Sequence, residues 1–231
     1  MEGKMLREWN QLPKAMRTKE VWPYYERLQK KKISLLLKRG FDLVFASVLL
    51  LLLAVPMLII SILIAGDSKG GIFFRQKRVT QYGKCFRIFK FRTMVANADR
   101  TGSQVTVSND NRITRVGAVL RKYRLDELPQ LFNILTGDMT FVGTRPESLY
   151  FVRNYQPEMM ATLLLPAGVT SEASIRYKDE AELLNQAGEA DQSYIERVLP
   201  AKMAYNLESL RKFSLVRELF TILRTAVAVI R

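Results

Sequence analysis

A cluster of acidic and basic residues in the middle of the chain is the strongest candidate for chemistry. Three cations precede the carboxylates Asp126 and Glu127, in the segment Arg121-Lys122-Tyr123-Arg124-Leu125-Asp126-Glu127-Leu128-Pro129. Nearby guanidinium groups favour ionised carboxylates. An ionised carboxylate can act as a nucleophile or as a ligand of Mg²⁺. The alternative is a helix cap with surface ion pairs, which an Asp-Glu pair taken alone does not exclude.

Pro129 determines the backbone expected around this pair. Proline disfavours helical geometry at the residue before it, which predicts a bend at Leu128. Proline is also favoured at the first position of a helix. The pattern therefore predicts a short helix from Pro129 to Leu135, closed by Gly137, with the acidic pair at its N-terminal end. The helix dipole adds to the arginines in favouring ionised carboxylates there.

Other cations occur in patterns that suit phosphate binding. Arg145 stands between a turn glycine and the rigid Pro146, and a guanidinium held in this way can bind phosphate through two hydrogen bonds. Lys90 and Arg92 alternate with aromatic residues, so both are expected on one face of a strand. A solvated strand face is the alternative for these two residues.

The overall composition limits the remaining chemistry. The 231 residues contain no histidine and one cysteine, which excludes histidine acid–base catalysis, histidine metal ligands, a cysteine-rich zinc site and an internal disulfide. Lysine and arginine number 36 against 22 aspartate and glutamate, which gives a formal net charge of +14. This excess favours partners that carry phosphates, nucleic acid or an anionic membrane surface.

A long apolar segment lies in the N-terminal third of the chain. The 23 residues Leu43–Ala65 carry no charge, which exceeds the roughly 20 residues that cross a bilayer core. Pro56 lies inside the segment and favours a kink. Basic residues flank both ends of the segment. Because positive charge tends to stay on the cytoplasmic side, a spanning helix should be basic at one end only. These features leave two alternatives, a kinked spanning helix and a helix that enters the membrane and returns.

The remaining patterns are local. Ile72–Phe74 and Lys84–Phe91 predict a hairpin, and Ile113–Tyr123 has helical spacing. Met203–Arg231 predicts a long amphipathic helix, with its first half expected to pack on the core and its second half able to lie in the membrane interface. Residues 1–37 form a basic leader with interspersed Trp and Tyr, which suits either the headgroup zone or loose packing on the domain.

Several motifs, taken in order, resemble the bacterial sugar transferases, which are monotopic polyprenyl-phosphate phosphoglycosyl transferases. The resemblance runs from about Lys38 to Arg145 and is weaker towards the C-terminus. The matching segments are Lys38-Arg39-Gly40-Phe41-Asp42, Phe73-Phe74-Arg75-Gln76, Lys90-Phe91-Arg92-Thr93-Met94, Arg121, Leu125-Asp126-Glu127-Leu128-Pro129-Gln130-Leu131-Phe132-Asn133, Gly137-Asp138-Met139 and Phe141-Val142-Gly143-Thr144-Arg145-Pro146-Glu147. The match is to the minimal catalytic form of the family.

The resemblance implies an activity. Such enzymes transfer a sugar-1-phosphate from a nucleotide diphospho-sugar, here expected to be a UDP-sugar, to polyprenyl phosphate, and glycoconjugate assembly starts with this step. The family's nucleophile matches Asp126, which would form a covalent phospho-sugar intermediate. Glu127 matches the residue tied to the Mg²⁺ site, to which Asp126 is also assigned. The candidates for substrate and phosphate binding are Arg121, Arg145, Lys90, Arg92 and Arg75.

The resemblance also implies a fold and a location. The family's apolar helix is re-entrant and breaks at a proline that matches Pro56. The expected fold is therefore α+β and mostly α, with a re-entrant membrane helix and interfacial amphipathic helices around a small catalytic domain that contains a β-hairpin. The expected division is 1–37 leader, 38–66 membrane helix, 67–200 catalytic domain and 201–231 C-terminal amphipathic helix. The catalytic domain is expected on the cytoplasmic face of the bacterial inner membrane, in contact with membrane lipids.

Three departures from the family pattern and two rival functions accompany this prediction. Val55 replaces the serine common before the helix-breaking proline, and Thr144-Arg145-Pro146 replaces the common Pro-Arg-Pro but keeps the arginine. The segment from Leu165 to Glu172 departs from the family's common sequence, which leaves the sugar unpredicted. The rivals are a membrane-tethered nucleic-acid-binding module and a scaffold. We expect no nucleic-acid partner, and a homodimer is compatible with the sequence.

Overall fold

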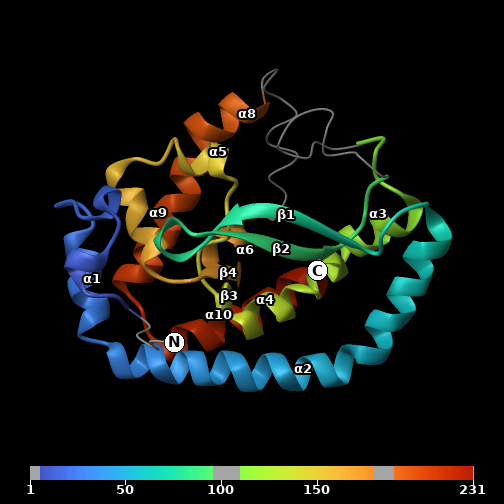
Figure 1. Ribbon diagram of the computed structural model, residues 1–231, viewed down its shortest axis with the longest axis horizontal. Helices are drawn as coiled ribbons and strands as arrows, with labels where there is room; N and C mark the ends of the chain where they lie inside the picture. The colour runs from blue at the N-terminus through green and yellow to red at the C-terminus, as the bar shows by residue number, and fades with distance from the viewer. Residues whose placement is uncertain (1–5, 96–109, 179–189, 231) are drawn as a thin grey trace.

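Helices make up most of the chain, and two small sheets lie among them (Figure 1). The computed structural model describes residues 6–95, 110–178 and 190–230. The helices are α1 (Trp22–Gln29), α2 (Lys32–Asp67), α3 (Arg115–Lys122), α4 (Gln130–Thr136), α5 (Leu149–Val152), α6 (Glu172–Arg176), α8 (Ala190–Ser193), α9 (Leu199–Arg211) and α10 (Leu215–Ile230). The strands are β1 (Phe73–Val79), β2 (Cys85–Phe91), β3 (Met139–Val142) and β4 (Ala167–Thr170). The predicted mostly helical α+β class is confirmed.

Helix α2 contains the long apolar segment and extends beyond it at both ends. It has 36 residues, and only 11% of its most apolar 18-residue window is buried. Among the described residues it is the one helix long and apolar enough to cross a membrane. Pro56 lies inside it, where it removes one backbone hydrogen bond. Figure 1 shows α2 running along the base of the molecule and then bending upward in its C-terminal part.

Both ends of α2 are tied to the same domain. Near its start, the Arg39 guanidinium donates to the carbonyl oxygens of Ile134 and Leu135 at 2.7 and 3.1 Å, which satisfies the C-terminal end of α4. At its far end, the Asp67 carboxylate accepts from the Val116 amide at 3.1 Å, at the start of α3. A straight helix of this length would extend about 54 Å. The bend therefore allows both ends of this long helix to contact one domain.

The predicted hairpin is confirmed as β1 and β2, which pair in antiparallel register from Phe73–Phe91 to Val79–Cys85. Its turn contains Tyr82 and Gly83, both with positive φ, of 58° and 77°. Phe86 and Ile88 of β2 are buried against Leu131 and Ile134 of α4. The hairpin therefore packs directly on the helix that follows the acidic pair.

The N-terminal segment is part of the core and does not pack loosely. Met16, Val21 and Leu28 are completely buried, and they belong to one cluster with Leu164 and Leu210. Tyr24 donates a hydrogen bond of 2.6 Å to the Glu158 carboxylate, which also fixes α1 to the domain. Large apolar and aromatic side chains facing inward therefore fix the described part of this basic leader to the domain.

The C-terminal region contains two helices where one was predicted. Helix α9 ends at Arg211 and α10 begins at Leu215, because Phe213 between them is 5% exposed and turns into the core. Leu207 and Leu210 of α9 are buried, as expected for the first half. Val216 and Phe220 of α10 are 60% and 61% exposed, so its outer face is apolar and open.

Candidate active site

The acidic pair lies on a short 3₁₀ turn, Leu125–Glu127, between α3 and α4. The bend predicted at Leu128 is absent, since Leu128 has helical dihedral angles and the turn continues towards α4. The chain direction changes instead at Arg124, which has φ 55° in the left-handed region. A left-handed conformation of a residue with a Cβ costs about 1–2 kcal/mol, and strain of this kind is common at functional sites.

Side chains from several elements hold this turn in place. The Asn133 amide of α4 accepts from the Phe89 amide at 2.8 Å and donates to the Arg87 carbonyl at 3.0 Å, so α4 is fixed to β2. Helix α3 lies against the end of the hairpin, and a Cβ at Gly117 would meet the Thr93 carbonyl oxygen at 2.1 Å. Only glycine allows this approach. The hairpin therefore supports the acidic turn through both neighbouring helices.

Two predicted cations converge on the acidic pair. The Lys90 ammonium lies 2.9 Å from a Glu127 carboxylate oxygen and 3.8 Å from Asp126 Oδ2. The Arg145 guanidinium donates to both Glu127 oxygens, one of them at 3.1 Å. Asp126 is 8% exposed, and the side chain of Glu127 is 10% exposed. The four residues come from β2, the 3₁₀ turn and the loop after β3, so the fold assembles a nearly buried ionic cluster.

The two carboxylates titrate in opposite directions. Burial raises the pKa of Asp126 above its usual range, and the neighbouring charge of Glu127 adds to this shift. The pKa of Glu127 is held well below its usual range by the Arg145 guanidinium and the Lys90 ammonium, which outweigh its own burial. Separated pKa values within one pair assign distinct roles to its two members. The fold therefore favours the ionised form of Glu127 and disfavours that of Asp126.

Among the described residues, Arg121 lies beside the ionic cluster but, unlike Lys90 and Arg145, forms no ion pair with Glu127. Burial lowers the pKa of its guanidinium, and the charge of Asp126 acts in the opposite direction. Within residues 6–95, 110–178 and 190–230 no hydrogen bond or ion pair occupies its guanidinium group. A partly buried arginine that the described residues leave without a hydrogen bond can bind phosphate oxygens. The structure thus brings Asp126, Glu127, Lys90, Arg145 and Arg121 together.

Arg92 and Arg75 lie elsewhere. The Arg92 guanidinium is 8% exposed and donates to the carbonyl oxygens of Ile64 and Ser68, at 3.3 and 2.6 Å, so it caps the C-terminal end of α2. Arg75 stacks over the ring of Phe89 at 4.3 Å. Lys90 and Arg92 make different contacts, since Lys90 reaches the acidic pair and Arg92, just after the end of β2, reaches the end of α2.

The chemistry of the acidic pair fits a magnesium ion only in part. The described segments hold no group of three or more His, Cys, Asp or Glu side chains placed to bind a metal. Mg²⁺ commonly uses one or two carboxylates and completes its octahedron with substrate phosphates and water. Asp126 and Glu127 match that requirement, although Arg145 and Lys90 already contact Glu127. The site therefore suits a metal that arrives together with a phosphorylated substrate.

The close pairing of β3 and β4 positions Arg145. The Gly168 amide donates to the Thr144 carbonyl at 2.8 Å, and the Gly143 amide donates to the Thr170 carbonyl at 3.0 Å. A Cβ at Gly168 would meet backbone atoms of Gly143 at 2.2 Å, so both strands need glycine here. The segment from Leu165 to Glu172, which departs from the family sequence and contains β4, therefore supports the turn that carries Arg145.

Sequence reasoning missed two buried ionic groups near the site. The Glu147 carboxylate accepts from the Tyr194 hydroxyl at 2.5 Å and lies 3.7 Å from the Lys202 ammonium. The Lys38 ammonium lies 2.6 Å from Glu218. Lys38 and Glu147 fall inside the matched motifs, which marks them as candidates. Their partners could not be predicted, because these lie far away in the chain.

Comparison with known proteins places these features in one family. A family model described as "Bacterial sugar transferase" matches residues 33–231. An *Aeromonas hydrophila* protein named UDP-N-acetylgalactosamine-undecaprenyl-phosphate N-acetylgalactosaminephosphotransferase is 34% identical over 192 residues, covering 82% of this chain and 42% of its own length. A *Bacillus subtilis* protein named putative undecaprenyl-phosphate N-acetylgalactosaminyl 1-phosphate transferase is 40% identical over 150 residues, covering 64% of this chain and 82% of its own.

A third relative is similar along most of both chains. The exopolysaccharide production protein ExoY of *Rhizobium meliloti* is 33% identical over 207 residues, covering 83% of this chain and 84% of its own. The chain spans less than half of the *Aeromonas* relative, and only 37% of a UDP-glucose:undecaprenyl-phosphate glucose-1-phosphate transferase of *Escherichia coli* that is 36% identical. The match includes the acidic turn, the hairpin and the long apolar helix, and the chain belongs to the bacterial sugar transferase family.

Proposed function

We propose that this protein transfers a sugar-1-phosphate from a UDP-sugar to a polyprenyl phosphate at a membrane surface, and that it starts the assembly of a polysaccharide or another glycoconjugate. The observation that carries the proposal is the ionic cluster, in which two carboxylates with pKa values shifted in opposite directions lie beside three cations. Both substrates carry phosphates, which suits the cations. The names of the relatives support the same reaction class.

In the first step, a carboxylate oxygen of Asp126 attacks the phosphorus next to the sugar. A bond forms between this oxygen and phosphorus, and the bond from phosphorus to the bridging oxygen of the diphosphate breaks. The nucleoside monophosphate leaves with the bonding electrons, and the sugar phosphate stays on Asp126 as an acyl phosphate. Burial keeps water away from this carboxylate and makes it a better nucleophile than a solvated one.

In the second step, an oxygen of the lipid phosphate attacks the same phosphorus and displaces the Asp126 carboxylate. The product is a polyprenyl diphospho-sugar, and the enzyme returns to its starting state. Two steps allow one nucleophile to meet a water-soluble donor and a membrane acceptor in turn. Arg145 and Arg121 orient the phosphate groups in both steps, because positioning and charge stabilisation dominate phosphoryl transfer.

Asp126 and Glu127 would hold Mg²⁺ when a diphosphate is bound. The ion would supply neutralisation of the negative charge that develops on the phosphates. Arg145 and Lys90 fix the orientation of the Glu127 carboxylate, so that its oxygens face the phosphate site in a defined geometry.

Removing either phosphate-binding arginine is expected to weaken the transition state strongly. Arg145→Ala and Arg121→Ala should each lower kcat/KM by roughly 10²-fold or more, the scale of a lost charge-assisted contact. Arg153→Ala, which removes an exposed arginine after α5, is the matched control and should leave kcat/KM within about twofold. Near-normal kinetics in both site variants would contradict the assignment.

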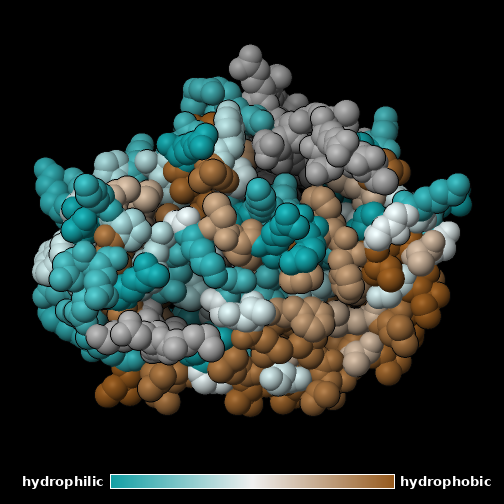
Figure 2. Space-filling view, viewed as in Figure 1, coloured by the Kyte–Doolittle hydropathy of each residue, from teal (hydrophilic) through white to brown (hydrophobic). Residues whose placement is uncertain are grey.

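We also propose that α2 is re-entrant and that both of its ends face the cytoplasm. The bend, the contacts of both ends with one domain and the basic flanks support this topology. The outer face of α2 around Pro56 is exposed and apolar, with Leu51 at 80%, Val55 at 66% and Leu58 at 61%, whereas Met57 is buried against the domain. Figure 2 shows apolar side chains covering the base of the molecule and its lower right corner, where α2 bends.

The topology has a direct test by cysteine labelling. On a Cys85→Ser background, Lys30→Cys and Lys69→Cys variants in intact cells should both be inaccessible to a membrane-impermeant maleimide. Both should react once the inner membrane is permeabilised, since both ends of a re-entrant helix stay on one side. Reaction of one site alone in intact cells would establish a spanning helix.

The reaction itself is tested by incubating the protein with a panel of nucleotide sugars, Mg²⁺ and polyprenyl phosphate, while nucleoside monophosphate release is measured. Release over many turnovers that requires one sugar nucleotide and the lipid acceptor supports the proposal. A nucleic-acid-binding module would instead bind RNA or DNA with a steep salt dependence and without need of Asp126. A scaffold would show no release with any donor.

A further inference from the structure

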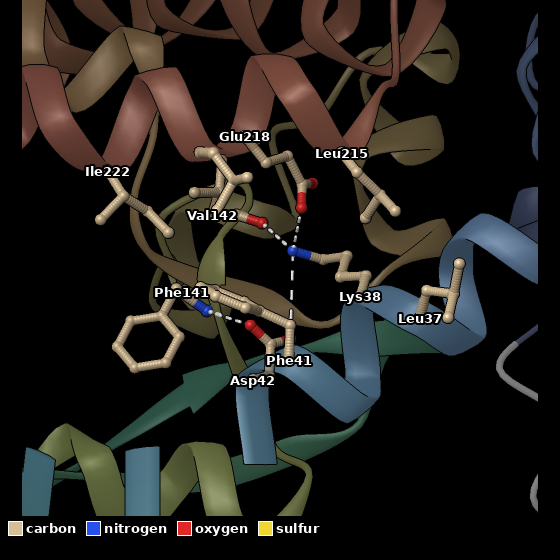
Figure 3. Close-up of a pocket in the computed structure, with 10 residues that line it drawn as sticks. Leu37, Lys38, Phe41, Asp42, Phe141, Val142, Leu215, Glu218 and Ile222 are labelled. Carbon is tan, nitrogen blue, oxygen red and sulfur yellow. Dashed lines mark hydrogen bonds and ion pairs between the residues drawn. The ribbon is translucent and has the colours of Figure 1, made fainter. Parts of the chain in front are cut away.

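A cavity of about 100 Å³ opens between α2 and α10, with β3 at its back. Leu37 and Phe41 of α2, Phe141 and Val142 of β3, and Leu219 and Ile222 of α10 line it (Figure 3). Apolar cavities of about 150 Å³ are large enough to bind benzene. The volume therefore suits a small branched hydrocarbon group such as one isoprene unit.

The polar groups in the cavity wall are occupied by one another. The Lys38 ammonium donates to the Val142 carbonyl at 3.0 Å and to the Glu218 carboxylate at 2.6 Å. The Asp42 carboxylate accepts from the Thr140 hydroxyl at 2.5 Å and from the Phe141 amide at 3.3 Å. Figure 3 shows Lys38 pointing toward Glu218 and the Val142 carbonyl, and Asp42 pointing toward the Phe141 amide. The charged side chains of the cavity are therefore already paired within the protein and are not available to bind a charged headgroup. A hydrocarbon chain requires no charged partner.

The mouth of the cavity belongs to the apolar surface of the molecule. Leu37 is 58% exposed and Leu219 is 45% exposed, and each lines the cavity from a different helix. Leu36 and Phe220, their neighbours in sequence, are 63% and 61% exposed. This surface is continuous with the outer face of α2, which is the part of the molecule suited to a lipid phase. The occupant therefore enters from the hydrocarbon phase and not from water.

Strand β3 connects the cavity with the ionic cluster. Val142 lines the cavity, and Arg145, three residues later, donates to Glu127. Three residues span at most about 11 Å. A lipid whose phosphate lies at Arg145 can therefore place the hydrocarbon nearest to that phosphate in the cavity. A phospholipid whose headgroup stays in the bilayer surface has no such reason to bind here.

We propose that this cavity binds one of the isoprene units nearest to the phosphate of the acceptor lipid. The inference rests on the proposed function and adds the place where the acceptor chain lies. Leu37, Phe41, Leu219 and Ile222 would then contribute to the affinity for the acceptor without touching the nucleotide sugar. The cavity aligns the lipid phosphate with Asp126 while the remainder of the chain stays in the bilayer.

The first test fills the cavity from either wall. Leu219→Trp and Leu37→Trp, assayed in lipid nanodiscs, should each raise the KM for an undecaprenyl phosphate acceptor at least tenfold, with the KM for the nucleotide sugar unchanged. Leu223→Trp places the same side chain on α10 outside the cavity, at a position 63% exposed, and should leave both constants unchanged. An unchanged acceptor KM in both filling variants, or an equal rise in the control, would overturn the proposal.

A second measurement does not depend on turnover. Undecaprenyl phosphate with a photoreactive diazirine in its second isoprene unit should label residues of α10 or β3 that line the cavity, and Leu219→Trp should abolish this labelling. A diazirine phospholipid should give no such labelling. Labelling by the phospholipid, unaffected by excess undecaprenyl phosphate, would make the cavity a general lipid site and overturn the proposal. Labelling by the isoprenoid probe without transfer from any donor would instead count against the proposed function alone.

Discussion

Asp126→Asn is expected to abolish transfer, with kcat lowered by roughly 10⁴-fold or more, the scale of a lost nucleophile. The neutral amide attacks phosphorus poorly and cannot form the acyl phosphate. Turnover would be measured as nucleoside monophosphate release with the cognate donor, Mg²⁺ and polyprenyl phosphate. The matched control is Asp138→Asn, which removes a carboxylate paired with Lys84 at the surface and should change kcat by less than about twofold.

The covalent intermediate gives the same prediction a second readout. Wild-type protein incubated with a labelled nucleotide sugar and Mg²⁺, without acceptor, should acquire label at Asp126. Added polyprenyl phosphate should then receive this label. Ordered ternary-complex kinetics without a trapped adduct would contradict the two-step mechanism, and Asp126 would then act as a base or as a metal ligand.

The pH dependence of the reaction should reflect the environment of Asp126. Because burial raises its pKa, the acidic limb of the kcat/KM profile should lie above the range of an exposed aspartate. Activity should fall as the pH decreases through this raised pKa, since only the ionised carboxylate attacks. A limb at the usual aspartate value would indicate that the carboxylate is solvated in the working enzyme.

Local patterns were sufficient to predict the elements that carry the site. Alternating aromatic residues around a Tyr-Gly turn predicted the hairpin, and Gly137 predicted the end of α4, where it adopts φ 86°. These features depend on neighbours in sequence, so one sequence reveals them. The structure also places the candidates Lys90 and Arg145, which both fall inside the family motifs, beside the acidic pair, and their role in phosphate binding stays a prediction.

Pairing across long distances in the chain was not predictable. Arg92 caps α2 because the bend returns the end of that helix to β2, and nothing in the local sequence distinguishes this arginine from Lys90. Lys38 and Glu218 are 180 residues apart and meet only through the packing of α2 on α10. The strained turn at Arg124 was missed for a related reason, since the surrounding structure stabilises a conformation that local propensity disfavours.

The opposite titration of the two carboxylates predicts opposite effects on stability. Glu127 has a lowered pKa, so its ionised form stabilises the fold above its unfolded-state value, and this stabilisation is lost as the pH falls through the folded value. Glu127→Gln should therefore lower the free energy of unfolding near neutral pH by about 1–3 kcal/mol, because Arg145 and Lys90 lose their charged partner. It should also lower kcat/KM by roughly 10²-fold or more, because Arg145 is no longer held in place.

Asp126→Asn should have the reverse effect on stability. A raised pKa means that the folded state binds its proton more tightly than the unfolded state, so the contribution of Asp126 is favourable at acidic pH and is lost as the pH rises through the folded value. Near neutral pH the buried charge destabilises the fold, and the amide removes it. Thermal unfolding in nanodiscs, without divalent cations, should thus give a higher Tm for Asp126→Asn than for wild type and a lower Tm for Glu127→Gln.

The difference in Tm between Asp126→Asn and Glu127→Gln decides the test, because a simple loss of packing would lower the Tm of both variants. At a pH below the pKa values of Asp126 in the folded and the unfolded state, the Tm difference between Asp126→Asn and wild type should disappear. Asp126 is then protonated in both states, and its neutral carboxyl group resembles the amide. A lower Tm for Asp126→Asn near neutral pH would show that its carboxylate is stabilised in the fold. The carboxylate would then lack the destabilised ground state that the proposed attack on phosphorus requires.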